Sequence, residues 1–145
     1  MFKRALLCVD GTRESRDALR QAAKLVAALK AETHVLVVSN LVQLASVHGV
    51  VTEVSLDIET SRCRSLLDEG LDWLRQHGVE PVCHVKAGTA VDVIAQTARD
   101  LCVDLVIVGH VARSPLGRWW AGSENTALSD RLRCSLLILS GAADP

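Results

Sequence analysis

Short, almost uninterrupted apolar runs recur along the chain and limit its fold more than any other feature. The clearest is Leu105-Val106-Ile107-Val108. A strand with one face in water alternates polar and apolar residues, so a continuous run indicates burial on both faces, as in a parallel sheet covered by helices. The runs predict strands at Ala5–Val9, His34–Ser39, Pro81–Val85, Asp104–Val108 and Ser135–Ser140.

Segments with helical periodicity separate these runs, and in each the apolar residues fall on one stripe. They predict helices over Ser15–Leu29, from about Asp57 to His77 with Gly78 as the stop, from Thr89 as the cap to about Leu101, and after Ser123 as the cap. Strands that alternate with helices predict a doubly wound α/β fold with right-handed crossovers. The 145 residues suit a single domain, 1–145.

Composition excludes several classes of partner. A formal net charge of −1 and an aromatic content of 3% argue against a nucleic-acid surface. No stretch approaches the roughly 20 apolar residues of a membrane span, so we expect no membrane insertion. The five cysteines form no C-x-x-C pair, and most stand inside apolar runs. Buried, reduced thiols are therefore expected, as is typical of a cytoplasmic protein.

Two segments could hold a ligand at the carboxyl ends of the strands, where open parallel sheets place their sites. The first is Asp10-Gly11-Thr12, whose carboxylate can accept hydrogen bonds from ribose hydroxyls or an adenine amine. The alternative is a simple turn, because Asp-Gly is a common turn dipeptide and Thr can cap a helix.

The second segment runs from Gly109 to Ser123 and ends at the start of the last predicted helix. Gly109 lets a ligand approach the backbone, and Gly122-Ser123 presents amide groups and a hydroxyl suited to phosphate. Arg113 and Arg118 add positive charge. The alternative is a surface loop before a capped helix. His110 can meet a phosphate or be an exposed loop residue, and the five histidines show no metal-ligand spacing.

Taken together, these features resemble the universal stress protein family. The resemblance rests on the strand that ends in Asp10-Gly11-Thr12, Gly88 before the third helix, and the spacing from Gly109 to Gly122-Ser123. It covers essentially the whole chain. It implies a three-layer α/β/α sandwich with a five-stranded parallel sheet in the order 3-2-1-4-5, of the Rossmann-like, adenine nucleotide alpha hydrolase-like type.

By this resemblance, Asp10 would contact adenosine, Val38 would line the adenine pocket and Gly109 would pass beneath the ribose and phosphates. The chain departs from the family's loop pattern at Ala112, where the family has a second glycine. The expected nucleotide-binding residues are Asp10, Gly11, Thr12, Val38, Gly109, His110, Ala112, Arg113, Gly122, Ser123 and Glu124. The expected ligand is ATP, with Mg²⁺ where a metal accompanies it.

The family contains members that bind ATP and members that do not. Without a Walker-type G-x-x-x-x-G-K-[ST] loop or a second carboxylate placed by a motif, we expect a nucleotide-binding stress-response or signalling component and no catalytic residues. The alternative is a dimeric protein-interaction module that binds no nucleotide. Under both, the resemblance implies a homodimer joined through the edge strand Ser135–Ser140, because an uncovered strand edge invites pairing. The protein partner stays unknown.

Overall fold

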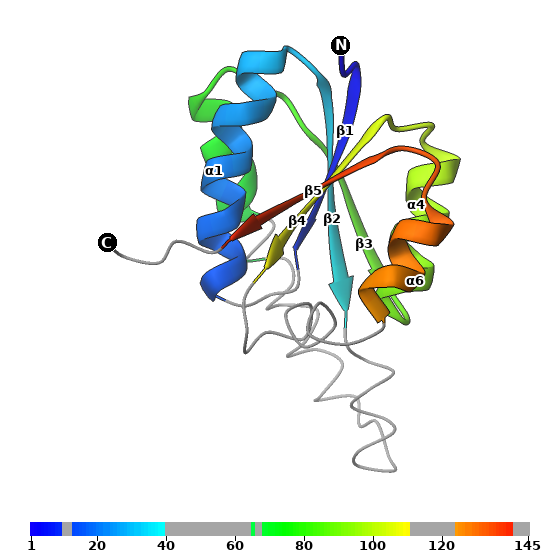
Figure 1. Ribbon diagram of the computed structural model, residues 1–145. Coiled ribbons are helices and arrows are strands. Elements are labelled where there is room, and N and C mark those ends of the chain that lie inside the picture. Colours follow the sequence, from blue (N-terminus) through cyan, green and yellow to red (C-terminus); the bar gives the residue numbers. More distant parts are fainter. Residues whose placement is uncertain (10–12, 40–64, 66–67, 111–123, 141–145) are drawn as a thin grey trace.

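The computed structural model describes residues 1–9, 13–39, 65, 68–110 and 124–140. Within them the strands form one parallel, five-stranded sheet in the order β3-β2-β1-β4-β5, which confirms the expected topology (Figure 1). The strands are β1 Arg4–Val9, β2 Glu32–Ser39, β3 Val82–Ala87, β4 Leu105–His110 and β5 Ser135–Ser140.

Helices cover both faces of this sheet (Figure 1). They are α1 Arg13–Leu29, α4 Ala90–Asp100 and α6 Glu124–Arg131, together with helical residues at 68–76. The segment 68–76 lies beside α1 on one side, and α4 and α6 lie on the other (Figure 1). The described part of the chain thus has the expected three layers, and the stretches 57–64 and 66–67 of the predicted second helix lie outside it.

The core has two halves, one on each face of the sheet. Leu7 of β1 packs with the α1 layer and is 1% exposed, whereas its neighbour Leu6 packs with the α4 layer and is 0% exposed. Successive side chains of a strand point to opposite faces, so a strand between two helical layers has no polar face. This double burial explains why the sequence shows continuous apolar runs.

Four of the five strands differ in extent from the sequence prediction. β1 begins one residue earlier than expected, at Arg4, and β2 begins two residues earlier, at Glu32. β3 was expected at Pro81–Val85 but runs from Val82 to Ala87, since Pro81 has no N–H for the ladder and Ala87 still pairs with Ser39. β4 was expected to end at Val108 but continues to His110. Gly109 and His110 are therefore strand residues, paired with β5.

The helix ends follow the predicted signals in part. Gly78 terminates the helical segment with φ of 80°, and the next residue, Val79, donates its N–H to Leu74 O at 2.9 Å, as in a Schellman motif. Thr89 is the N-cap of α4 as expected, but its side chain makes no capping hydrogen bond. Ser123, the cap expected for α6, lies outside the described residues.

Candidate functional site

The carboxyl ends of β1 and β4 mark the position where a ligand site is expected. These strands are neighbours in the sheet, but the chain leaves β1 toward β2 on one side and leaves β4 toward β5 on the other. Strand order thus reverses between them, and in open parallel sheets ligands bind outside the strand ends at such a point. The register pairs Cys8 with Val108, so the two strands end at nearly the same level.

Gly109 is a described site residue near the carboxyl end of β4. It lies in β4 opposite Leu139 and is buried. It lines a cavity of about 10 Å³ together with Val9 and α1 residues such as Ala18. That volume is about the minimum for one water molecule. Because α1 packs this closely on the sheet, a nucleotide would have to lie beyond the strand ends.

Val38 is at the carboxyl end of β2, as expected of a residue near the site. Its side chain is only 4% exposed and belongs to the core cluster beneath α4, on the same face of the sheet as Leu36. Its neighbour across the ladder is Lys86 of β3. Val38 is therefore a core residue at the carboxyl end of β2.

Of the remaining predicted site residues, the structure describes the backbone of two and does not describe the other seven. His110 ends β4 and Glu124 begins α6, so their backbones are fixed by those elements. The other seven, Asp10, Gly11, Thr12, Ala112, Arg113, Gly122 and Ser123, lie outside the described residues. In sequence they continue directly from the ends of β1 and β4 and directly precede α6.

A second polar cluster, which the sequence analysis missed, joins β1, β2 and β3 farther back on the sheet. His34 Nε2 lies 2.9 Å from Glu32 Oε1, and His34 Nδ1 lies 3.2 Å from His84 Nε2. Glu32 also pairs with Arg4, whose Nε is 3.4 Å from Oε2. The two imidazole rings stack with centroids 5.4 Å apart and an angle of 28° between their planes.

The carboxylate of Glu32 sets the direction of the hydrogen bonds that run from Glu32 through His34 to His84. An ionised Glu32 can only accept, so His34 donates from Nε2–H and, when neutral, keeps a lone pair on Nδ1. His84 must then donate its Nε2–H to that lone pair. The hydrogen bond from His34, together with the nearby Arg4 charge, lowers the pKa of Glu32. Burial, with lesser effects of His34 and Lys86, lowers the pKa of His84.

The signal that could have revealed this cluster is a histidine within each of two apolar runs that pair as neighbours. His34 is 6% exposed, which is unusual for a polar residue unless it has partners. The two residues are fifty positions apart. Only the pairing of β2 with β3 brings them together.

A larger cavity, of about 190 Å³, lies between α4, α6 and the start of β5. Arg99, Arg131 and Arg133 line it together with apolar side chains such as Leu132. Arg131 is paired with Asp92 of α4. This cavity is at the amino ends of β4 and β5, opposite the predicted site, and is smaller than the roughly 300–1,000 Å³ of most small-molecule pockets.

The cysteines correct one expectation. Only Cys8 is buried; Cys83 and Cys134 are partly exposed and Cys102 is exposed, while Cys63 lies outside the described residues. All four described thiols are free. Within the same part of the chain, no three His, Cys, Asp or Glu side chains gather as a metal site. Nor is any helix there long and apolar enough to cross a membrane.

Comparison with known families and structures gives a consistent result. The profile of the universal stress protein family matches residues 1–140. A search of curated proteins gives no match.

Among solved structures, a universal stress protein in complex with cAMP is similar with a TM-score of 0.71 and 19% identity, over 97% of this chain and 98% of that one. The universal stress protein UspA from Lactobacillus plantarum gives 0.75 and 16%, over 94% and 97%. A universal stress protein from Archaeoglobus fulgidus in complex with dAMP gives 0.64 and 14%, over 94% and 96%.

Proposed function

The chain belongs to the universal stress protein family, and from that premise we propose that it binds an adenine nucleotide across the carboxyl ends of β1 and β4. The observation that carries the proposal is the reversal of strand order between these two strands, with buried Gly109 beside it. Two relatives of the same fold are described in complex with cAMP and with dAMP, both adenine nucleotides.

The chemistry of the residues around this position supports a nucleotide. A glycine at position 109 leaves the backbone open to a ribose or phosphate group, since it carries no Cβ. Val38 is an apolar residue at the carboxyl end of the neighbouring strand β2, a residue type that suits a purine ring, and its side chain is 4% exposed. Asp10 follows β1 directly and offers a carboxylate for ribose hydroxyls or the adenine amine.

We propose ATP, accompanied by Mg²⁺, as the nucleotide, with Gly122 and Ser123 contacting phosphate and Arg113 adding positive charge. Binding, rather than turnover, is the proposed activity, and it fits a cytoplasmic stress-response or signalling component. Ala112 is the residue on which the choice of nucleotide depends, because a methyl group stands where the family pattern has a glycine.

The test is calorimetric titration of the nucleotide-stripped protein with Mg-ATP, and separately with cAMP and dAMP. We expect saturable binding at one site per chain, and we expect Asp10→Ala to weaken it at least tenfold. The matched control is Asp100→Ala. Asp100 is an exposed carboxylate at the end of α4, bonded to Gln96, and it should leave binding unchanged. No heat with any of the three nucleotides would contradict the proposal.

The exposed edge strand favours a second candidate function, that of a dimeric protein-interaction module. β5 ends the sheet, and Ile138 on it is 43% exposed, one of few large apolar side chains so exposed in the described part of the chain. Leu137 and Leu139 on its other face are only partly buried. Unpaired backbone groups beside apolar side chains suit pairing with a second copy through Ser135–Ser140. This candidate and nucleotide binding are compatible.

A further inference from the structure

We propose that His34 and His84 form a binding site for a divalent transition-metal ion of the class that prefers imidazole, such as Zn²⁺ or Cu²⁺. The site is separate from the proposed nucleotide site. His34 stands five residues before the end of β2, which places it roughly 16 Å from the carboxyl edge of the sheet. The inference does not rest on nucleotide binding.

The spacing of the two ring nitrogens fits a shared metal ion. His34 Nδ1 and His84 Nε2 are 3.2 Å apart. Zinc–imidazole bonds measure about 2.0–2.1 Å, so an ion bonded to both nitrogens would make an angle of about 100° between them. A tetrahedral site needs about 109°, which corresponds to a nitrogen separation of about 3.4 Å. The nitrogens need to part by only a few tenths of an ångström, and each ring must turn by about 40° so that its lone pair points at the ion instead of along the line between the two nitrogens.

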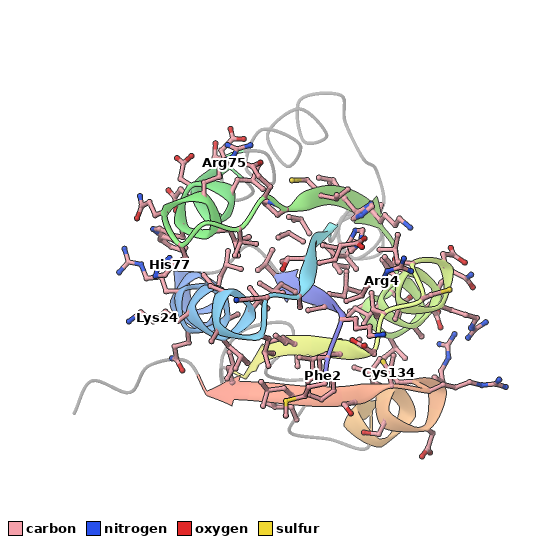
Figure 2. The ribbon with its side chains drawn as sticks, turned by 90° about the horizontal axis from the view of Figure 1, so that it is seen from above. Phe2, Arg4, Lys24, Arg75, His77 and Cys134 are labelled. Atoms are coloured by element: carbon pink, nitrogen blue, oxygen red, sulfur yellow. The ribbon has the colours of Figure 1, made fainter. Side chains whose placement is uncertain are left out.

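His34 is already prepared as a ligand by its neighbour. Glu32 accepts the Nε2–H of His34 at 2.9 Å, which leaves the lone pair of a neutral ring on Nδ1, directed at His84. Metal-binding histidines commonly donate their other N–H to a carboxylate in this way, and the carboxylate fixes the ring and makes it more basic. Arg4 in turn holds Glu32, and Figure 2 shows Arg4 on the side of the sheet that α4 covers.

His84 supplies the second nitrogen from the exposed side. It stands on β3, the strand at the edge of the sheet, and is only partly buried, so an ion can reach it from solvent. To bind, neutral His84 moves its proton from Nε2 to Nδ1 through water, which frees the Nε2 lone pair without net release of a proton. Glu32 bonds the other nitrogen of His34, and no three His, Cys, Asp or Glu side chains of the described residues gather as metal ligands, so water completes the coordination.

The same layer contains a buried oxygen with no partner. Thr97 of α4 is 0% exposed, and its Oγ1 finds no hydrogen-bond partner among the described residues. Helix α4 covers the face of the sheet from which Leu36 and the even-numbered residues of β2, including His34, project. Buried polar groups normally have a hydrogen-bond partner, so a water molecule is expected beside this hydroxyl.

The experiment is a calorimetric titration with Zn²⁺ of the full-length protein, treated with EDTA beforehand and free of nucleotide. We expect one Zn²⁺ per chain, and we expect His84→Gln to weaken this binding at least tenfold. Glu32→Gln should also weaken it, by about 10- to 100-fold, because the carboxylate that orients His34 is lost. His77→Gln is the matched control: His77 is exposed, bonds to Trp73 O and lies on the opposite helical layer (Figure 2).

Long-range ¹H–¹⁵N spectra of the wild-type protein provide the second readout and do not depend on any variant. Zn²⁺ should shift His34 Nδ1 and His84 Nε2 and should leave the ring of His77 unchanged. Three results would each overturn the proposal: no Zn²⁺ binding, equal affinity in wild type and His84→Gln, or saturation by Zn²⁺ without a shift at these two nitrogens. The last two would mean that the histidines form only a hydrogen-bonded pair and that zinc binds elsewhere, for example at exposed Cys102.

Discussion

Asp104 and Arg4 are joined by two reciprocal hydrogen bonds: the Arg4 N–H donates to Asp104 Oδ1 at 3.0 Å, and the Asp104 N–H donates to Arg4 O at 3.0 Å. The second carboxylate oxygen accepts the N–H of Lys3 at 2.8 Å. Asp104 was expected to begin β4, but the strand starts at Leu105. Its side chain instead fixes the start of β1 against the start of β4.

The first prediction concerns the acid stability of this connection. The backbone hydrogen bond from Lys3, followed by that from Arg4, lowers the pKa of Asp104. A lowered folded-state pKa means that Asp104 stabilises the protein above the ordinary aspartate pKa of about 3.9, and that this contribution is lost as pH falls through the folded-state value. Asp104→Asn should therefore unfold at lower urea than wild type near neutral pH.

In acid the urea midpoints of wild type and Asp104→Asn should converge. Protonated Asp104 has lost its negative charge and accepts the two backbone hydrogen bonds more weakly. Asp100→Asn is the control, since Asp100 is exposed and bonds only within α4 to Gln96. Urea midpoints measured across the acid range decide the matter. A difference between wild type and Asp104→Asn that does not shrink with falling pH would contradict the role of the carboxylate.

The second prediction compares two glycines with positive φ. Gly88 has φ of 144°, and a Cβ there would lie 2.9 Å from Val93 Cγ2, whereas Gly78 has φ of 80° and open space around it. Gly78→Ala should cost about 1–2 kcal/mol, from backbone strain alone. Gly88→Ala should lower the free energy of unfolding by more than Gly78→Ala does. Its backbone strain of about 1–3 kcal/mol adds to the cost of the close contact with Val93. Urea unfolding of both variants provides the comparison, and equal losses would show that Val93 moves aside freely.

The third prediction tests the edge of the sheet. Lysine at position 138 places a charge on β5, and charged side chains on edge strands oppose pairing. We expect Ile138→Lys to sediment as a monomer in analytical ultracentrifugation. Val85→Lys is matched to it, since Val85 is 49% exposed on β3 at the opposite edge, and it should sediment as the proposed wild-type dimer does. An unchanged dimer in Ile138→Lys would remove β5 from the interface.

The fourth prediction concerns thiol reactivity. Burial, with a lesser effect of Cys134, raises the pKa of Cys8 far above the ordinary thiol value, so Cys8 is neither accessible nor ionised in the folded protein. Among the four described thiols, exposed Cys102 should react first with a disulfide reagent such as Ellman's. Cys102→Ser should remove a fast phase, and peptide mapping should find Cys8 modified only after unfolding. Modification of Cys8 in the folded protein would show that its side of the core opens.

The sequence predicted the architecture because burial on two faces leaves a direct signature in the residue order. Leu6 and Leu7, adjacent in the chain, are both in the core on opposite faces of the sheet, as is typical of a parallel strand covered by helices on both sides. Strand ends were predicted less well. Gly109 lacks a side chain to reveal its position, and its place in β4 follows from its pairing with Leu139.

The candidate site was only partly predictable for a different reason. Asp10 and Gly109 stand near the ends of strands that the sequence predicts. Their position in a possible ligand site could therefore be inferred from the neighbouring residues alone. The His34–His84 contact depends on the register between β2 and β3, in which His34 lies opposite Val82. Register is set by the whole sheet and by the long connection between the strands, so no local pattern specifies it.

The order of the strands also has a consequence for synthesis on the ribosome. β1 pairs with β2 within the first 39 residues, but its other neighbour, β4, begins at Leu105 and pairs with Ala5 across a separation of 100 positions. The edge of β1 that pairs with β4 stays without a partner strand until most of the chain has been synthesised. The emerging chain thus carries an exposed strand edge, a natural binding target for a chaperone, which is closed only when β4 arrives.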